Sequence, residues 1–366
     1  MNIFLLGATP SISAEAGEDP ISKLVKTGGN TGNQVIARGL LDRIVYDDIS
    51  WDHRIDPKAV HERFDMVVVA AANFLFPKFD FGGMADYIER ADLPVAIVGL
   101  GAQSNNYDPK ISLMPGTERF VKVISERAAS IGVRGPYTQE VLAQRGVYNV
   151  TVTGCPSYYM GGADSMRIRR RPFDEIKRIS INASRDVIVH SFDKDKMRRL
   201  VQGIYSTGIT WKADFIAQSE QSEIRLADKQ ARAVEESLKE LSAFLTNVAP
   251  EVGVRSWAAD HLRVFFDVDA WLDMIQTYDF VFGSRFHGCM VALQRGVPAL
   301  VICHDTRTED MCRFLGMPFV SIVDLDEIDV AQLYDRLGLE TLDRRYQELY
   351  PAYTRFLTVN KLIAKE

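Results

Sequence analysis

Cysteine is scarce in this sequence, with four residues among 366. None of them has a second cysteine at the paired CxxC spacing, so the sequence indicates neither a disulfide framework nor a zinc site. We therefore expect reduced thiols in a cytoplasmic protein, with no bound metal. The four residues are Cys155, Cys289, Cys303 and Cys312.

The sequence also lacks an excess of positive charge. Its 43 Lys and Arg residues are outnumbered by 49 Asp and Glu residues, which gives a formal net charge of -6. Proteins that bind nucleic acid usually present a basic face, so we expect no nucleic-acid partner. An anionic ligand would have to be attracted by positive charge gathered locally, because the molecule as a whole repels it.

No apolar run in the sequence is long enough to span a membrane. Residues 1–6 are apolar, but the stretch is short and has no basic region before it, so it indicates a first strand and not a signal peptide. Any membrane contact would therefore be peripheral. The three arginines at 169–171 would be the place to meet an anionic lipid, although a solvated linker is the more ordinary explanation of so short a run.

What the sequence does contain is a repeated alternation of short apolar runs and amphipathic segments. Residues 66–71 and 95–100 are continuous apolar runs, as in strands that are buried on both faces of a sheet. Residues 33–44 place apolar side chains at helical spacing. Repeated β-α-β units of this kind predict parallel sheets with right-handed crossovers.

A chain of 366 residues is long enough to form two domains. The alternation of strand-like and helix-like segments is interrupted once. The interruption begins with two glycines and ends near an Arg-Arg-Arg-Pro run, which indicates a linker. We therefore predict an α/β fold of two Rossmann-like, doubly wound domains that face a cleft, as in the GT-B arrangement. The expected parts are an N-terminal domain over 1–160, a linker over 161–177, a C-terminal domain over 178–340, and a C-terminal helix over 341–366 that crosses back to the N-terminal domain.

The second half of the chain is less regular than the first. Residues 210–216 predict a strand, and residues 224–245, rich in Ala, Glu, Lys and Leu, predict one long helix. The next strand is assigned to either 253–255 or 262–265. Residues 280–283 are apolar and predict a strand that runs directly into a helix.

The most informative motif lies at that strand–helix junction and starts with Gly283 and Ser284. The free N–H groups and the dipole of a helix start attract a phosphate or a carboxylate. Arg285 would add a fork of donors for the same anion, and His287 would add a group that titrates near neutral pH. Both side chains reach one ligand only if Arg285 lies in the turn or at the first helical position, because residues two apart on a helix diverge. A domain-interface salt bridge of Arg285 and a structural role for His287 remain alternatives.

The other candidate residues also lie in turns at the edges of predicted strands and helices. A glycine-rich loop allows close backbone approach to a ligand, and asparagine, glutamine and serine side chains can both donate and accept. Because the carboxyl ends of parallel strands meet at one crevice, we expect these residues to converge. Cys155 is a weaker candidate, since nothing in the sequence would activate its thiol. The expected ligand-binding residues are Asn30, Asn33, Gln103, Ser104, Arg134, His304 and Arg307.

The same segments resemble the polysaccharide pyruvyl transferases. The Asn-Thr-Gly-Asn stretch that starts at Asn30 is similar to the family's Asn-x-Gly-Asp loop, and Arg134 stands where the family has an Arg before a helix. The segment from Arg285 to His287 is similar to the family's Arg-x-His motif. The resemblance extends over about residues 28–320.

Three positions depart from the family's pattern. Asn33 stands where an Asp is common, and Cys155 stands where many members have an Asp before the Pro. Ser104 falls near a position where some members carry a functional His. The side of the cleft that binds the acceptor is therefore expected to differ most from the family.

The resemblance implies transfer of the pyruvyl group of phosphoenolpyruvate to a sugar of an exopolysaccharide or cell-wall glycan precursor, as a ketal, with release of phosphate. Phosphoenolpyruvate would be the donor substrate, with no cofactor, and the saccharide acceptor would be either free or lipid-linked. Arg285 and Arg134 would bind the anionic groups, and His287 would act as the general acid or bind the leaving phosphate. Residues 30–33 and Gln103 would shape the cleft from the N-terminal side.

Two alternatives lead to different observations. A GT-B glycosyltransferase would share the fold and would need a carboxylate for the ribose of its nucleotide sugar, for which Glu309 and Asp310 are available. Stabilisation by UDP or GDP but not by phosphoenolpyruvate would favour it. A non-catalytic scaffold of the same fold would keep Arg285 and His287 at low exposure, with no cleft between the domains.

Overall fold

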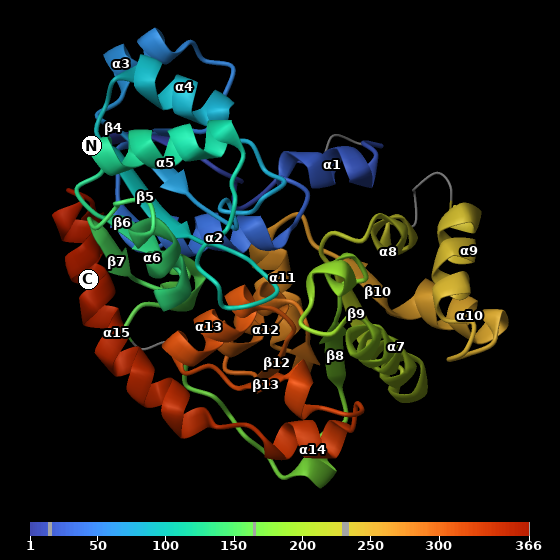
Figure 1. The fold of residues 1–366 in the computed structure, drawn as a ribbon. Helices are drawn as coiled ribbons and strands as arrows, with labels where there is room; N and C mark the ends of the chain where they lie inside the picture. The colour runs from blue at the N-terminus through green and yellow to red at the C-terminus, as the bar shows by residue number, and fades with distance from the viewer. Residues whose placement is uncertain (14–16, 164–165, 229–233, 366) are drawn as a thin grey trace.

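The computed structural model describes residues 1–13, 17–163, 166–228 and 234–365. Its first half forms a six-stranded parallel sheet with the order β3-β1-β4-β5-β6-β7 (Figure 1). The central strands β4 and β5 are buried along their whole length, which explains their continuous Val, Ala and Ile runs. The strands are β1 (Asn2–Leu6), β3 (Asp48–Ser50), β4 (Met66–Ala70), β5 (Val95–Leu100), β6 (Ile131–Val133) and β7 (Val150–Val152).

Helices cover this first sheet and connect its strands. Several begin with proline at the first helical positions, where the missing N–H costs nothing. The helices are α1 (Pro20–Lys26), α2 (Gly32–Leu41), α3 (Pro57–Arg63), α4 (Gly82–Ala91), α5 (Pro115–Arg127), α6 (Pro136–Ala143) and the 3₁₀ turn η1 (Pro156–Tyr159).

The second half forms another six-stranded parallel sheet, with the order β10-β9-β8-β11-β12-β13. In chain order this is 3-2-1-4-5-6, the Rossmann order, and the direction of winding reverses between β8 and β11. Both halves are thus doubly wound α/β domains. The strands are β8 (Ile179–Asn182), β9 (Asp214–Ala217), β10 (Leu262–Val264), β11 (Phe280–Gly283), β12 (Ala299–Cys303) and β13 (Phe319–Ser321).

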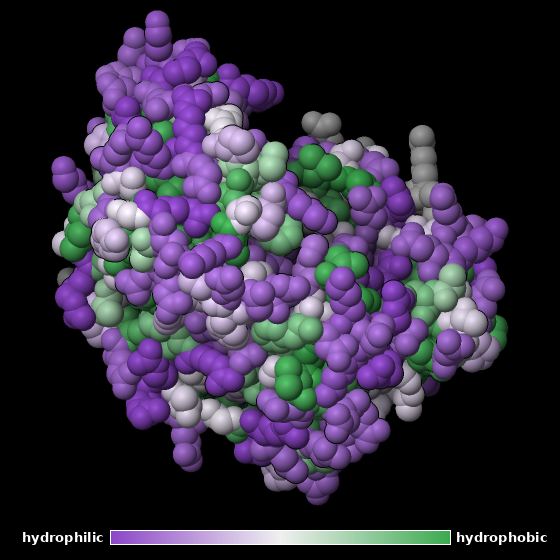
Figure 2. Space-filling model, in the orientation of Figure 1, coloured by the Kyte–Doolittle hydropathy of each residue, from purple (hydrophilic) through white to green (hydrophobic). Residues whose placement is uncertain are grey.

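The helical segments of the second half follow the same alternation. They are η2 (Phe173–Glu175), η3 (Asp186–His190), α7 (Lys194–Trp211), α8 (Gln221–Ala227), α9 (Val234–Phe244), α10 (Glu251–His261), α11 (Val268–Ile275), α12 (Phe286–Gln294), α13 (Thr306–Leu315), η4 (Ile322–Asp324), α14 (Val330–Asp335) and α15 (Leu339–Val359). In the described part of the chain, none of the helices is both long enough and apolar enough to cross a membrane. The face drawn in Figure 2 is mainly hydrophilic, with separate apolar patches.

Two boundaries in the second half differ from the prediction, and one open alternative is decided. The strand expected at 210–216 begins only at Asp214, because α7 continues to Trp211 and packs its small residue Gly208 against Ile181. The helix expected at 224–245 is two helices, α8 and α9, and part of it, residues 229–233, lies outside the described residues. Residues 253–255 belong to α10, whose buried face has helical spacing, so the strand is the later of the two alternatives.

The last helix returns to the N-terminal domain. In Figure 1, α15 starts beside the C-terminal domain and runs along the flank of the first sheet. Tyr353 of α15 stacks on Tyr159 with 4.1 Å between ring centroids, and the side chain of Asn360 accepts from the backbone N–H of Ser130 at 3.2 Å. The chain then ends in β14 (Ile363–Ala364), which pairs antiparallel with β2 (Ile44–Val45).

The two domains also contact each other directly. A single apolar cluster contains residues of α2 from the N-terminal domain and of α12 from the C-terminal domain, among them Val35 and Cys289. Backbone hydrogen bonds cross the junction from Thr31 N–H to Gln218 O at 2.9 Å and from Ile12 N–H to Phe266 O at 2.9 Å. This packing holds the strand ends of both sheets close together.

Candidate active site

The Gly-Ser-Arg-Phe-His motif lies where the second sheet reverses its winding. β11 ends at Gly283, whose Cβ, if it had one, would overlap the carbonyl oxygen of Asn182 on the neighbouring strand β8. Only glycine allows the two strands to approach so closely here. Arg285 is the N-cap of α12 and has extended backbone angles, so it lies in the turn before the helix. This is the position that Arg285 needs if it and His287 are to reach the same ligand.

The Arg285 side chain is fixed by residues at the ends of β8 and β9. Its Nη2 donates to Ser184 Oγ at 2.8 Å and also contacts Ser219 Oγ and the Glu220 carboxylate. Its backbone N–H donates to Asn182 Oδ1 at 2.8 Å. The ion pair between Arg285 and Glu220 is therefore formed within the C-terminal domain. The alternative from the sequence, a salt bridge of Arg285 across the domain interface, is not found among the described residues.

Glu220 is a buried carboxylate that keeps its charge. Burial alone would raise its pKa, but Arg285 and the Ser184 hydroxyl more than offset this, so that the pKa of Glu220 is lowered. The guanidinium of Arg285 is therefore partly neutralised and held in one orientation. Glu220 limits how much net charge Arg285 offers to a ligand, while it fixes where that charge is.

The imidazole of His287 points toward the N-terminal domain. Its Nε2 lies 3.4 Å from Cys155 Sγ. Its Nδ1 lies beside Gly32 at the start of α2, where a Cβ would come within 2.7 Å of it. The same position would be 3.0 Å from Asn30 Oδ1 and 3.2 Å from Gln218 Oε1, so polar atoms from both domains converge there.

Electrostatics keep His287 neutral in the ligand-free protein. Burial lowers its pKa well below the usual value, and the positive charges of Arg134, Arg307 and Arg285 lower it further. Three guanidiniums and an imidazole thus share one region of a protein whose net charge is -6. Glu220 offsets part of this charge at Arg285 and Asp305 offsets part of it at Arg307, and the positive charge that remains is what an anionic ligand requires.

Arg134 reaches this region from the N-terminal domain. It is buried, its Nε donates to Gly99 O at 2.7 Å, and its Nη2 donates to Ala71 O at 3.1 Å. It therefore also ties the end of β5 to the residue that follows β4. Burial lowers its pKa, as expected for a cation in a site with little water.

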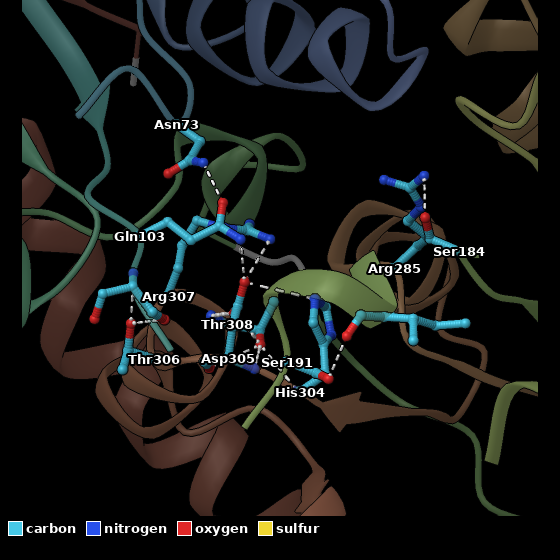
Figure 3. A network of polar contacts seen from close by, with 12 residues as sticks. Asn73, Gln103, Ser184, Ser191, Arg285, His304, Asp305, Thr306, Arg307 and Thr308 are labelled. Carbon is cyan, nitrogen blue, oxygen red and sulfur yellow. Dashed lines mark hydrogen bonds and ion pairs between the residues drawn. The ribbon is translucent and has the colours of Figure 1, made fainter. Parts of the chain in front are cut away.

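A second polar group, drawn in Figure 3, lies around the start of α13. Gln103 Nε2 donates across the domain junction to Asp305 Oδ2 at 2.8 Å, while Asp305 Oδ1 caps α13 by accepting from Thr308 N–H at 2.8 Å. The Arg307 guanidinium lies 3.6 Å from Asp305 Oδ2, and His304 Nε2 lies 3.5 Å from the same atom. Burial lowers the pKa of His304 to about 4, although Asp305 opposes the shift.

Several buried polar atoms of this region have no hydrogen-bond partner among the described residues. In a packed interior such atoms are almost always paired, and each unpaired one is costly. Their concentration here supports a ligand-binding site, whereas the low exposure of His287 and the Arg285 side chain, 7% and 13%, is what the non-catalytic alternative would also show. The atoms are Thr31 Oγ1, Asn73 Oδ1, Gln218 Nε2, Ser284 Oγ, Arg285 Nε, His304 Nδ1 and Nε2, and Arg307 Nε.

Two predicted residues use their polar groups within the protein. Asn33 Nδ2 donates to Thr27 O at 3.0 Å and closes its own loop. Ser104 N–H donates to Thr306 Oγ1 at 3.2 Å, and the Thr306 hydroxyl donates back to Ser104 O at 2.9 Å, so that Ser104 joins the domains through its backbone. Their roles toward a ligand remain predictions.

The two carboxylates that a nucleotide-sugar enzyme would use are already engaged. Glu309 accepts from Ser321 Oγ at 3.1 Å and from Arg313 Nε at 3.0 Å. Asp310 accepts from Tyr137 N–H of the other domain at 3.1 Å, and burial raises its pKa to about 6.

Sequence reasoning did not find Glu220, Gln218, Asn182 and Asn73. Gln218 and Glu220 follow β9, Asn182 ends β8, and Asn73 follows β4. The rule that ligands bind beyond the carboxyl ends of parallel strands would have selected them, had it been applied to these strands as well.

Comparison with known proteins completes this description. Among solved structures, the chain is similar to Anabaena Alr3699/HepE in complex with UDP, with 10% sequence identity, a TM-score of 0.45, and coverage of 99% of this chain and 98% of that chain. The UDP-GlcNAc 2-epimerase of Methanocaldococcus jannaschii has 13% identity, a TM-score of 0.43, and coverage of 98% and 99%. Similarities this low carry no inference about activity.

No curated protein matches the chain. The sequence model of one family, the polysaccharide pyruvyl transferases, matches residues 30–306, which is most of the chain and includes both the Asn30 loop and the Arg285–His287 motif. The protein therefore belongs to the polysaccharide pyruvyl transferase family and is a transferase.

Proposed function

We propose that this transferase uses phosphoenolpyruvate as its donor and attaches the pyruvyl group to a saccharide of a glycan precursor as a ketal. In the balanced reaction, two acceptor hydroxyls add to the central carbon of the donor, its methylene carbon becomes a methyl group, and phosphate leaves. Of the two protons that the hydroxyls lose, one reaches the methylene carbon and the other leaves with the phosphate or enters solvent.

The observation that carries the proposal is the group of three arginines around His287, with unpaired donors beside them. Phosphoenolpyruvate has a carboxylate and a phosphate on a three-carbon frame and requires fixed donors for both. We assign its anionic groups to Arg285, Arg134 and Arg307, with Ser284 Oγ and the start of α12 as further donors. The arginines supply the positive charge in this scheme, so it involves no metal ion and no cofactor.

For His287 the geometry favours one of its two expected roles. The ring is neutral in the ligand-free protein because it is buried beside three guanidiniums. A neutral imidazole is a poor acid but a good hydrogen-bond donor. We therefore assign His287 to the leaving phosphate, to which it donates a hydrogen bond as negative charge develops.

The acceptor would approach from the N-terminal domain. Asn30 Oδ1 and Gln218 Oε1 lie near the Nδ1 side of the buried His287 ring, and amide groups of this kind bind sugar hydroxyls. Asn73 and Gln103, whose side chains hydrogen-bond to each other after β4 and β5, are further amide groups of the N-terminal domain.

The test is phosphate release from phosphoenolpyruvate with a panel of hexosides, free and lipid-linked, and with mass analysis of each acceptor. We expect release that depends on an acceptor, a pyruvylated product, and activity that persists in a chelator. If no acceptor supports release, and UDP or GDP raises the Tm while phosphoenolpyruvate does not, the proposal is wrong and the nucleotide-sugar alternative takes its place.

A further inference from the structure

The imidazole of His287 has a buried thiol on one side. Cys155 Sγ lies 3.4 Å from Nε2, and the Ser157 hydroxyl donates to the same sulfur at 3.0 Å. Cys155, Ser157 and His287 are all buried. The sulfur therefore has two polar neighbours. The Ser157 hydroxyl donates to it, and the thiol can in turn donate to Nε2 of His287.

The backbone around Cys155 fixes the sulfur in place. The preceding Gly154 has φ +76°, a conformation that favours glycine, and it turns the chain after β7. The following η1 packs so closely on α2 that a Cβ on Gly39 would meet the Ser157 backbone. A thiol held in this way can select between the two neutral forms of a neighbouring imidazole.

Either Cys155 Sγ or His287 Nε2 can donate across their 3.4 Å contact. The sulfur accepts from Ser157, so its own hydrogen is available for Nε2 of His287. A neutral imidazole that accepts at Nε2 carries its hydrogen on Nδ1. Nδ1 is the nitrogen that faces Gly32, where a Cβ would also lie near Asn30 Oδ1 and Gln218 Oε1.

We propose that Cys155 is a positioning residue that fixes His287 as the neutral Nδ1–H tautomer, so that the ring presents a hydrogen-bond donor to the ligand. A carboxylate at the same place would have the opposite effect, because it would accept from Nε2–H and leave Nδ1 bare or stabilise the imidazolium. The charged groups that act on the ring, Arg134, Arg285 and Arg307, are all cations and disfavour the imidazolium.

The first test does not depend on activity. The nitrogen-15 NMR spectrum of histidine-labelled, ligand-free protein at pH 7 would be assigned by comparison with His287→Gln. We expect a protonated Nδ1 and an unprotonated Nε2 in the native protein and in Cys155→Ser, whose hydroxyl keeps a donor. Cys155→Ala should release the ring to a mixture of tautomers, and Cys155→Asp should protonate Nε2.

A native spectrum with the proton on Nε2, or with both nitrogens protonated, would overturn the inference. So would a Cys155→Ala spectrum identical to that of the native protein. If Cys155→Ala fails to fold, the comparison of Cys155→Ser with Cys155→Asp still decides between the two tautomers. Cys312→Ala, which removes a buried thiol of α13, is the matched control and should leave the His287 signals unchanged.

The second test rests on the proposed function and measures phosphate release from phosphoenolpyruvate. Loss of a group that orients a site residue typically costs about 10–100-fold. We expect Cys155→Ala to lower kcat by about tenfold or more with a smaller change in KM, and Cys155→Ser to restore most of the loss. A Cys155→Ala variant with a lower Tm but native kcat would show a purely structural role and would overturn the inference. No turnover by the native protein, with the expected tautomer present, would count against the proposed function only.

Discussion

Gln103 Nε2 lies 2.8 Å from Asp305 Oδ2, and this hydrogen bond joins the two domains at the edge of the candidate site. The same carboxylate caps α13 and lies 3.6 Å from the Arg307 guanidinium. The Asp305 side chain therefore contacts the other domain, the start of a helix and an arginine of the candidate site. The protein holds its domains together at the edge of the proposed binding site.

Removal of this link should affect stability and binding together. Gln103→Leu leaves the buried Asp305 with one donor fewer, and hydrogen bonds to charged groups contribute about 1.5–3 kcal/mol. We expect a loss of about 2 kcal/mol in the free energy of unfolding, measured by urea denaturation, and a raised KM for phosphoenolpyruvate. Gln139→Leu on the exposed face of α6 is the control and should change neither quantity.

Arg285 has a structural partner, so its role in binding must be separated from its role in folding. Arg285→Met alone leaves Glu220 buried without its cation, which should destabilise the protein by about 3–5 kcal/mol. The double variant Arg285→Met, Glu220→Gln should recover most of that stability, because no charge is left unpaired. It should not recover phosphate release. Recovery of both would show that Arg285 is only structural.

Gly32 should tolerate no side chain. A Cβ there would lie 2.7 Å from His287 Nδ1 and would occupy the space between the two amide oxygens. We expect Gly32→Ala to lower kcat/KM by at least about tenfold, since it displaces the ring that we assign to the phosphate. Gly83→Ala in α4, where a Cβ meets nothing within 4 Å, is the matched control. Equal activity of the two variants would contradict the proposed position of the ligand.

The ligand-free protein should lose stability in mild acid. His287 and His304 have lowered pKa values in the folded protein, to about 4 for His304, while an unfolded histidine takes up a proton near about pH 6.5. The unfolded state therefore binds more protons below that pH, so the stability is fully present above it and is lost as the pH falls toward 4. Asp310, whose pKa is raised to about 6, acts in the opposite direction.

Thermal unfolding from pH 7.5 to 5 would measure this dependence. His304→Gln should flatten it, because one of the two buried groups that resist protonation is gone. His53→Gln, which changes an exposed histidine, should leave the slope as it is. A slope that is unaffected by His304→Gln would mean that this ring takes up its proton over the same pH range in the folded and the unfolded protein.

The sequence was sufficient for those parts of the site that depend on local geometry. A strand, a glycine and a helix start within one short segment predict where Arg285 lies, and the rule for parallel strands brings Gln103, Arg134 and His304 into the same region. It was not sufficient for the pairings, because Arg285 with Glu220 and His287 with Cys155 join residues 65 and 132 positions apart. Such pairs depend on how the two sheets pack, which no local pattern encodes.

The boundaries around α7 and α10 show the same limit in the fold. Residues 210–211 favour a strand by composition, yet α7 continues through them because its buried face packs on the second sheet. Residues 253–255 were ambiguous because three residues are too few to distinguish the helical period from the strand period. The helix there is determined by Val254, Trp257 and Ala258, which share one buried face.

The return of α15 has a topological consequence. The first strand, β1, and the last, β14, both belong to the N-terminal domain, where Met1 O accepts from Asp47 N–H and Lys365 lies over the Tyr46 ring (Figure 1). The C-terminal domain is thus an insertion within the N-terminal one. Detachment of α15 and β14 from the N-terminal domain would therefore leave the two domains joined by one chain connection and by their direct contacts.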